Sequence, residues 1–153
     1  DLNGRSPEEI IELLEANFIV TKAKKETRPT IKHEFTMYLN SKWYKLKLIT
    51  PPLSENPTDH LDPRILSKLI LHPILGITDL KTDSRILFLN GKNGMKGLQK
   101  KVDSGFAKIA FGLFPVSVRD LMHVADTNNI MPPKSTYIEP KLRSGLTIYE
   151  LQD

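Results

Sequence analysis

The sequence predicts a mixed α+β domain with a mixed, mainly antiparallel sheet and about four helices packed on it. Three observations predict this class. Segments with helical spacing of apolar residues are interleaved with segments rich in β-branched and aromatic residues, without a regular strand–helix–strand rhythm. Two strand patterns, at 35–39 and 43–48, are separated by a very short connection, which is typical of a hairpin. The sequence contains no internal repeat, which argues against a solenoid.

The first element is a helix that begins after Ser6. Ser6, Pro7 and Glu9 form the pattern of a capping box with proline at the first helical position. Apolar residues follow at helical spacing, so we expect the helix to end near position 16 or 17. Residues 18–21 are short and β-branched and predict a strand, and 22–30 predict a charged loop.

The hairpin comes next, with Asn40-Ser41 as its turn. Alternation in its second strand predicts that Tyr44, Leu46 and Leu48 face the core, and that the lysines between them lie in water. Residues 51–63 contain four prolines and predict a linker without regular structure.

A second helix is expected to begin with Asp62 as its cap, followed by Pro63. Pro73 is expected to end this helix, because a proline disfavours the helical conformation at the preceding His72. The apolar run at 85–89 predicts a short buried strand.

The remaining elements alternate. We expect a helix over 95–102 that stops at Gly105, a strand within 107–114, a helix capped by Ser117, and a last strand at 146–149.

Length and composition indicate one domain that spans 1–153, which we expect to be the C-terminal domain of a longer protein. The chain has no cysteine, which excludes disulfides and thiolate metal sites and permits a cytoplasmic location, the one we expect. No apolar run approaches the roughly 20 residues that cross a bilayer, so no membrane partner is expected. The formal net charge of +4 is compatible with phosphorylated ligands or nucleic acid.

Catalytic and metal sites are not indicated by the motifs. The glycine-rich segment 91–97 lies before a predicted helix but matches neither the P-loop nor the dinucleotide fingerprint. The four histidines are scattered without the spacing of helical metal ligands, so no metal ligand is predicted. No serine lies in a nucleophile elbow.

The segment 131–146 is the strongest candidate site. It combines three cations, three hydroxyls and a glycine in a loop that prolines stiffen. Cations and hydroxyls on one loop suit phosphate, because charge-assisted hydrogen bonds to phosphate are strong. The predicted phosphate or anion ligands are Lys134, Ser135, Thr136, Lys141, Arg143 and Gly145. A solvated strap that leads into the last strand is an equally good interpretation of the composition.

Several of these segments together resemble one protein family. The Met-Pro-Pro-Lys-Ser-Thr run at 131–136 is the most specific of them, and the others are 43–46, 71–77, 115–122, 124–126 and 139–146. These motifs resemble the C-terminal part of the bacterial "domain of unknown function 1015" family. One departure is that Tyr137 is followed by Ile138, where the family commonly has a second aromatic residue.

The resemblance implies a function for the longer protein. The region that precedes this part in the family carries an Asp-Gly-His-His-Arg-type motif similar to the ParB and free serine kinase group, and that motif is absent from this sequence. The resemblance therefore implies a nucleotide-dependent enzyme, of the small-metabolite kinase kind, that uses ADP or ATP with Mg²⁺. The partners of this domain would be the N-terminal half of the same protein and a nucleotide or small phosphorylated ligand.

Two alternatives stay open. Lysines gather around Lys24 and around Lys100, which would suit a regulatory or nucleic-acid-binding module. A purely structural domain, packed against the N-terminal half through the proline-rich loop, is the other alternative.

Overall fold

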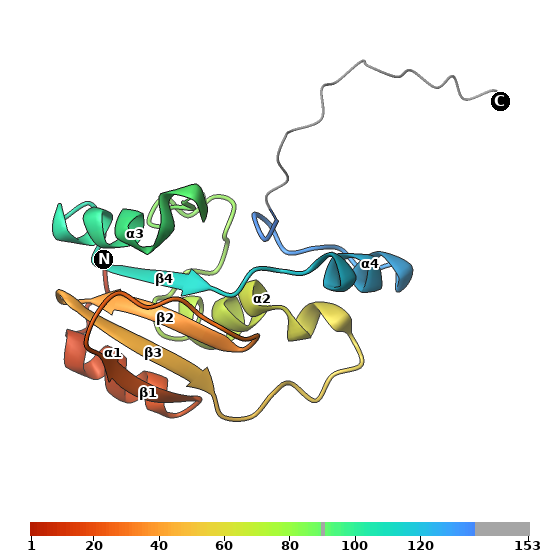
Figure 1. Cartoon of the computed structure of the whole chain (residues 1–153), viewed down its shortest axis with the longest axis horizontal. Helices are drawn as coiled ribbons and strands as arrows, with labels where there is room; N and C mark the ends of the chain where they lie inside the picture. The colour runs from red at the N-terminus through yellow and green to blue at the C-terminus, as the bar shows by residue number, and fades with distance from the viewer. Residues whose placement is uncertain (90, 137–153) are drawn as a thin grey trace, which may run out of the picture.

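The computed structural model describes residues 1–89 and 91–136, and it confirms the mixed α+β class (Figure 1). The helices within this part are α1 (Pro7–Glu15), α2 (Asp62–Leu66), α3 (Gly94–Asp103) and α4 (Val118–Asp126), and the strands are β1 (Phe18–Ala23), β2 (Glu34–Leu39), β3 (Lys42–Leu48) and β4 (Ile109–Leu113). Short helical turns η1 (Pro57–His60) and η3 (Gly91–Asn93) precede α2 and α3, and a π-helical turn, η2 (Ser67–Leu71), extends α2.

The four strands form one antiparallel sheet in the order β1-β3-β2-β4. The predicted hairpin of β2 and β3 is confirmed, and its turn residues Asn40 and Ser41 both have positive φ, 48° and 58°. That geometry matches the right-handed twist of the two strands, as in type I′ turns. Because β3 separates β1 from β2, residues 24–33 must cross β3 to reach β2.

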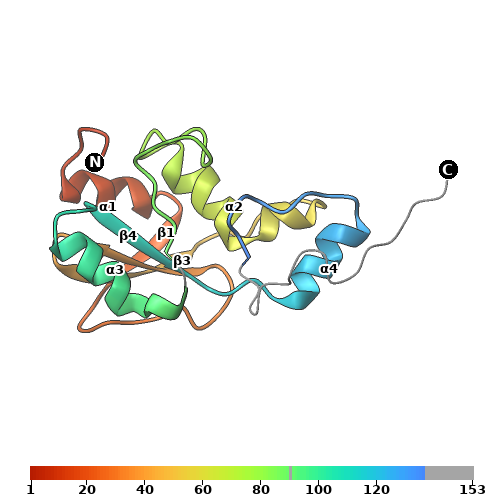
Figure 2. The ribbon, with the colours of Figure 1, turned by 90° about the horizontal axis from the view of Figure 1, so that it is seen from above.

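Helices cover both faces of the central strand β2, which is buried at all six positions. On one face Phe35, Met37 and Leu39 join the main core with apolar residues of α1, α2 and η2. On the other face Thr36 contacts Met95 of α3. Figures 1 and 2 show α3 beside β4 and α2 on the far side of the sheet. The sheet is therefore a central layer between helices.

The prediction for the face of β3 is confirmed for its apolar residues and incomplete for its lysines. Tyr44, Leu46 and Leu48 are buried in the core. Lys47 is exposed as expected, whereas Lys45 is half-buried and its Nζ lies 3.2 Å from Oε1 of the buried Glu34. The partner of Lys45 lies on the neighbouring strand, which the local alternation does not specify.

The predicted role of Asp62 is wrong. Leu61 occupies the N-cap position of α2, and Asp62 lies inside the first turn, where it is buried. Its Oδ1 accepts a 2.9 Å hydrogen bond from the backbone N–H of His33 in the segment before β2. The carboxylate thus connects α2 to a distant loop instead of capping its own helix.

The predicted position of the end of the second helix is confirmed, since the helical segment ends at Leu71 with His72 as its C-cap, but the expected conformation of His72 is wrong. His72 keeps helical dihedral angles, φ −72° and ψ −61°, although Pro73 follows it. The helix widens before the proline, which has no N–H, to the i to i−5 hydrogen bonds of a π-helix. The His72 N–H donates to the Ser67 carbonyl in this pattern. The turn ends at Gly76, whose φ of 66° suits a residue without Cβ.

Residues 85–89 do not form the predicted buried strand. Leu87 and Phe88 are exposed, and no strand pairing is present in this segment. Both sides of the buried strand β2 are already occupied by β3 and β4, so the sheet offers this apolar run no central position. Arg85 instead donates hydrogen bonds to the carbonyls of Leu75 and Gly76, where the helical turn ends.

The local signals for the other helices are confirmed. Ser6 and Ser117 each form a capping box, with Glu9 and Asp120. The predicted strand at 146–149 lies outside the described residues. Within the part of the chain that is described, no helix is long and apolar enough to cross a bilayer.

Candidate anion-binding turn

The segment that carries the candidate site is directed by the end of α4. The N–H of Asn128 donates to the Ala125 carbonyl and the N–H of Asn129 donates to the Val124 carbonyl, while Asn128 has a φ of 55°. This is a Schellman motif with asparagine in the left-handed position. It reverses the chain, so that the following residues run back across α2 (Figure 2).

Residues 132–135 form a tight turn within this segment. The Ser135 hydroxyl donates a 2.6 Å hydrogen bond to the Pro132 carbonyl, and Pro133 occupies the second position of the turn. Lys134 occupies the third position with a φ of 57°. Turns with proline second and a positive φ third usually have glycine or asparagine there. A lysine in the left-handed conformation destabilises the fold by about 1–2 kcal/mol relative to a glycine. The side chain of Lys134 is exposed.

A shallow hollow of about 280 Å³ lies beside the turn. Met131, Pro132 and Pro133 form one wall, together with Ile130. The opposite wall comes from η1, α2 and the residues after them, namely Thr58, Pro63, Arg64, Ser67 and Leu80. The prolines therefore hold the turn next to a wall that offers a guanidinium and two hydroxyls.

Arg64 is the cation of this hollow, and its side chain is 55% exposed. Its Nε lies 3.6 Å from Oδ1 of Asp59, too far for a hydrogen bond and close enough for an ion pair. A 2.8 Å hydrogen bond from the Ser54 hydroxyl, and the charges of Lys68 and Arg64, lower the pKa of Asp59. Asp59 therefore stays ionised and offsets part of the positive charge, and the guanidinium keeps donors for a second anion.

Three of the six predicted ligands lie in this turn or directly after it, because they are consecutive in the sequence, and none of the three lines the hollow. Lys134 and Thr136 are exposed, so both can reach a ligand in solvent. Ser135 is half-buried and its hydroxyl proton is engaged by the Pro132 carbonyl, so it would have to break that bond to donate to phosphate. Lys141, Arg143 and Gly145 lie outside the described residues.

Sequence reasoning did not identify Arg64 as a member of the site. It lies about 70 positions before the turn, inside a short helix whose pattern predicts only a cap and an apolar stripe. The shared wall of α2 and the proline pair exists only in the folded chain, so no local signal could have joined them.

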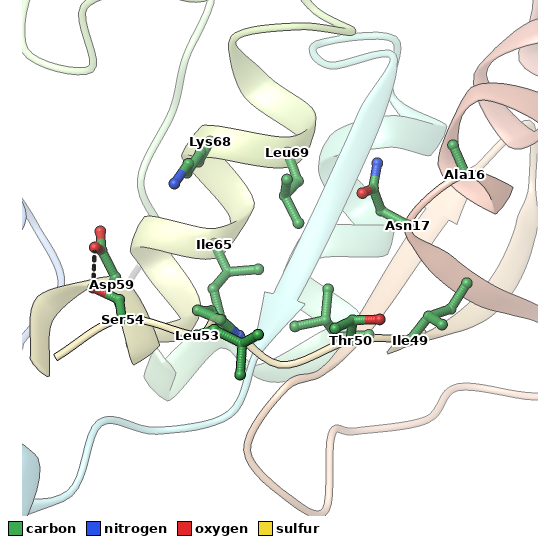
Figure 3. Close-up of a pocket in the computed structure, with 12 residues that line it drawn as sticks. Ala16, Asn17, Ile49, Thr50, Leu53, Ser54, Asp59, Ile65, Lys68 and Leu69 are labelled. Atoms are coloured by element: carbon green, nitrogen blue, oxygen red, sulfur yellow. Dashed lines mark hydrogen bonds between the residues drawn. The ribbon is translucent and has the colours of Figure 1, made fainter. Parts of the chain in front are cut away.

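A second hollow of similar volume lies between the end of α1, the segment after β3, and α2 with η2 (Figure 3). Ile65 and Leu69 project into it from the helical segment, and Asn17 and Thr50 lie on its other side. Its polar groups do not converge: the Asp59 carboxylate is engaged by Ser54. We therefore assign no chemistry to this hollow.

The histidines near Asp62 have structural partners. The ring Nε2 of His33 lies 3.1 Å from the His60 carbonyl, and the ring Nε2 of His60 lies 2.6 Å from the Ser54 carbonyl. Burial raises the pKa of Asp62 to about 6, against the opposing effect of the His33 amide and of the His33 and Lys32 side chains. Over 1–89 and 91–136, no three histidine or acidic side chains gather as metal ligands would.

Comparison of the chain with models of protein families, with curated proteins and with solved structures gives no match.

Proposed function

We propose that this chain is the accessory C-terminal domain of a nucleotide-dependent phosphotransferase, and that its 132–135 turn and Arg64 together bind a phosphate group. The observation that carries the proposal is the conformation of Lys134, an exposed cation in a left-handed position beside a hollow that a second cation lines. Strained residues of this kind persist where the surroundings hold them, and they cluster at ligand sites.

The chemistry of the two cations supports phosphate over a carboxylate or a neutral ligand. Arg64 offers a planar fork that can hold two oxygens, and Lys134 offers a point charge with freely rotating donors. Thr58 and Ser67 add hydroxyls on the same wall, although the Thr58 hydroxyl already donates to Asn56 Oδ1 at 2.7 Å. A phosphate has three or more acceptor oxygens to satisfy, which suits this mixture.

The resemblance to the bacterial family supports a nucleotide, ADP or ATP, as the source of that phosphate. Mg²⁺ would accompany it, but the hollow is a poor place to hold the ion. Within the described residues, the carboxylate that pairs with Arg64 is that of Asp59, which Ser54 and Arg64 already engage. The ligands of Mg²⁺, and the reacting groups, would belong to the other half of the protein.

Thermal unfolding of the 153-residue chain tests the proposal, with pyrophosphate, ADP, ATP with and without Mg²⁺, and sulfate as probes. A ligand at a hundred times its Kd stabilises the folded state by about 2.7 kcal/mol, which shifts Tm by roughly 5–10 °C at this size. The test variants are Lys134→Gly, which keeps the turn and removes the ammonium, and Arg64→Ala. The matched control is Lys47→Ala, an exposed lysine of β3 whose chain neighbours do not line the hollow either.

Stabilisation by pyrophosphate or nucleotide that both test variants abolish, and that the control retains, supports the proposal. Lys134→Gly should also raise Tm without ligand, because glycine relieves the positive φ. No shift with any phosphate compound, confirmed by calorimetric titration at millimolar pyrophosphate, overturns the proposal for this chain. A shift that survives both variants overturns the assignment of the site.

A further inference from the structure

One end of the sheet gathers lysines that are far apart in the sequence. Ala23 pairs with Trp43, and Leu39 pairs with both Lys42 and Ile109, so β1 and β2 end where β3 and β4 begin. Lys24 follows β1, Lys42 begins β3 and Lys108 precedes β4, and all three are therefore at this end. Four strands at about 4.8 Å spacing make a row roughly 14 Å wide.

Helix α3 brings further lysines to the same end. The hydroxyl of Tyr38, near the end of β2, donates a 2.8 Å hydrogen bond to Oδ1 of Asp103, the last residue of α3. Lys100 and Lys101 lie in the final turn before Asp103. The two lysine groups that the sequence shows about 75 positions apart thus form one surface, which we call the basic end and define as residues 24–26, 39–42 and 100–108.

The basic end holds most of the unbalanced charge of the chain. It contains six lysines, at positions 24, 25, 42, 100, 101 and 108, against Glu26 and Asp103. That difference equals the formal net charge of the whole chain, +4. None of the six forms an ion pair with another described residue, and all except Lys101 are exposed. Unpaired lysines that repel one another at one end are stabilised by a polyanion.

An exposed aromatic ring lies among these lysines. Phe106, in the connection between α3 and β4, is 67% exposed, and Nζ of Lys101 lies 4.4 Å from the centre of its ring. Within the basic end it is the only large apolar side chain that is exposed in the described structure. Aromatic rings beside cations are the platforms on which the bases of single strands stack.

We propose that the basic end binds single-stranded nucleic acid, with the lysines on the phosphates and Phe106 under a base. Its excess of four positive charges can neutralise about four phosphates of one strand. An anionic membrane is the less suitable partner, because insertion into lipid needs buried apolar area and this surface offers a single exposed ring. The proposal does not depend on the phosphate site at 132–135.

Fluorescence anisotropy with a labelled 12-nucleotide oligo(dT) or oligo(U) tests the proposal on the 153-residue chain between 25 and 200 mM KCl. A plot of log Kd against log[KCl] should have a slope near 3, because about four phosphates are neutralised and each contributes about 0.7. The double variant Lys24→Gln/Lys108→Gln should lower that slope by about 1.4. The control Lys47→Gln/Lys81→Gln has the same net charge, removes exposed lysines outside the basic end, and should leave the slope unchanged.

Phe106→Ala tests the stacking, and we expect about tenfold weaker binding with an unchanged salt slope. Absence of binding at 25 mM KCl, or equal losses in the two double variants, overturns the proposal. Binding of a duplex of the same length as tightly as the single strand overturns the assignment to single strands. A membrane partner would also overturn the proposal. It would be shown if the native chain bound vesicles with 30% phosphatidylserine but no oligonucleotide, and if Lys24→Gln/Lys108→Gln lost the binding to vesicles.

Discussion

Replacement of Asp62 by asparagine should make the stability of the protein less dependent on pH. Asp62 is 3% exposed, and its Oδ2 has no hydrogen-bond partner among the described residues. Burial raises its pKa from 3.8 to about 6, although the N–H of His33 and the charge of Lys32 act in the opposite direction. Asp62→Asn keeps an oxygen that can accept from the His33 N–H and removes the titration.

The sign follows from proton binding. Between pH 3.8 and about 6 the folded state holds the Asp62 proton and the unfolded state has released it, so the free energy of unfolding falls as pH rises. About 2 pH units at 1.36 kcal/mol per unit give a loss of about 3 kcal/mol, complete above pH 6. The advantage of Asp62→Asn over the native protein should therefore grow by about 2 kcal/mol from pH 4 to pH 7.

Urea unfolding at half-unit intervals of pH measures this difference, with the fluorescence of Trp43, the single tryptophan, as the probe. The control is Asp83→Asn, because the hydrogen bonds from Arg85 lower the pKa of Asp83 to about 2. Its effect on stability should not change between pH 4.5 and 7. A constant difference between Asp62→Asn and the native protein over pH 4–7 would refute the raised pKa, and a difference that shrinks toward pH 7 would show that the fold stabilises the anion.

Three further variants test the packing and the helix ends by urea unfolding. Gly112→Ala should lower the free energy of unfolding by about 1–3 kcal/mol, because its Cβ would lie 2.5 Å from Oγ1 of the buried Thr36; Gly91→Ala, whose Cβ meets no atom within 4 Å, should have a much smaller effect. Arg85→Ala should cost about 1 kcal/mol through the carbonyls that it caps after η2, and an unchanged midpoint would show that water replaces it. Ser117→Ala should lower the free energy of unfolding by about 1 kcal/mol, because it opens the capping box of α4. A decrease below about 0.3 kcal/mol would contradict that role.

Features that depend on a few neighbouring residues could be predicted from the sequence. The capping boxes at Ser6 and Ser117 need only a hydroxyl and a carboxylate three positions later. The hairpin needs a two-residue turn between alternating strands, and Asn40 tolerates the positive φ that such a turn requires. These signals lie within one turn of the chain, so the rest of the fold does not alter them.

Features that depend on distant partners could not be predicted. Asp62 has the sequence context of a cap, but the His33 N–H that it accepts from is 29 positions away. The apolar run at 85–89 has the composition of a strand, but the central sheet positions are taken. The candidate site shows the same division: Lys134 was found from the motif, while Arg64 lies next to the turn only through the packing of the proline pair near α2.

The strand order has a consequence for how the protein folds. β2 and β3 can pair across a two-residue turn, whereas β2 meets β4 only when Leu39 and Ile109, roughly 70 positions apart, come together. Closing a loop of that length costs about 4 kcal/mol of chain entropy before any contact forms, against very little for the hairpin. We therefore expect β4 and α3 to dock after the hairpin has formed on α1 and β1. Until they dock, the buried strand β2 has an open edge, and a chain that ends before residue 109 would keep that edge and aggregate through it.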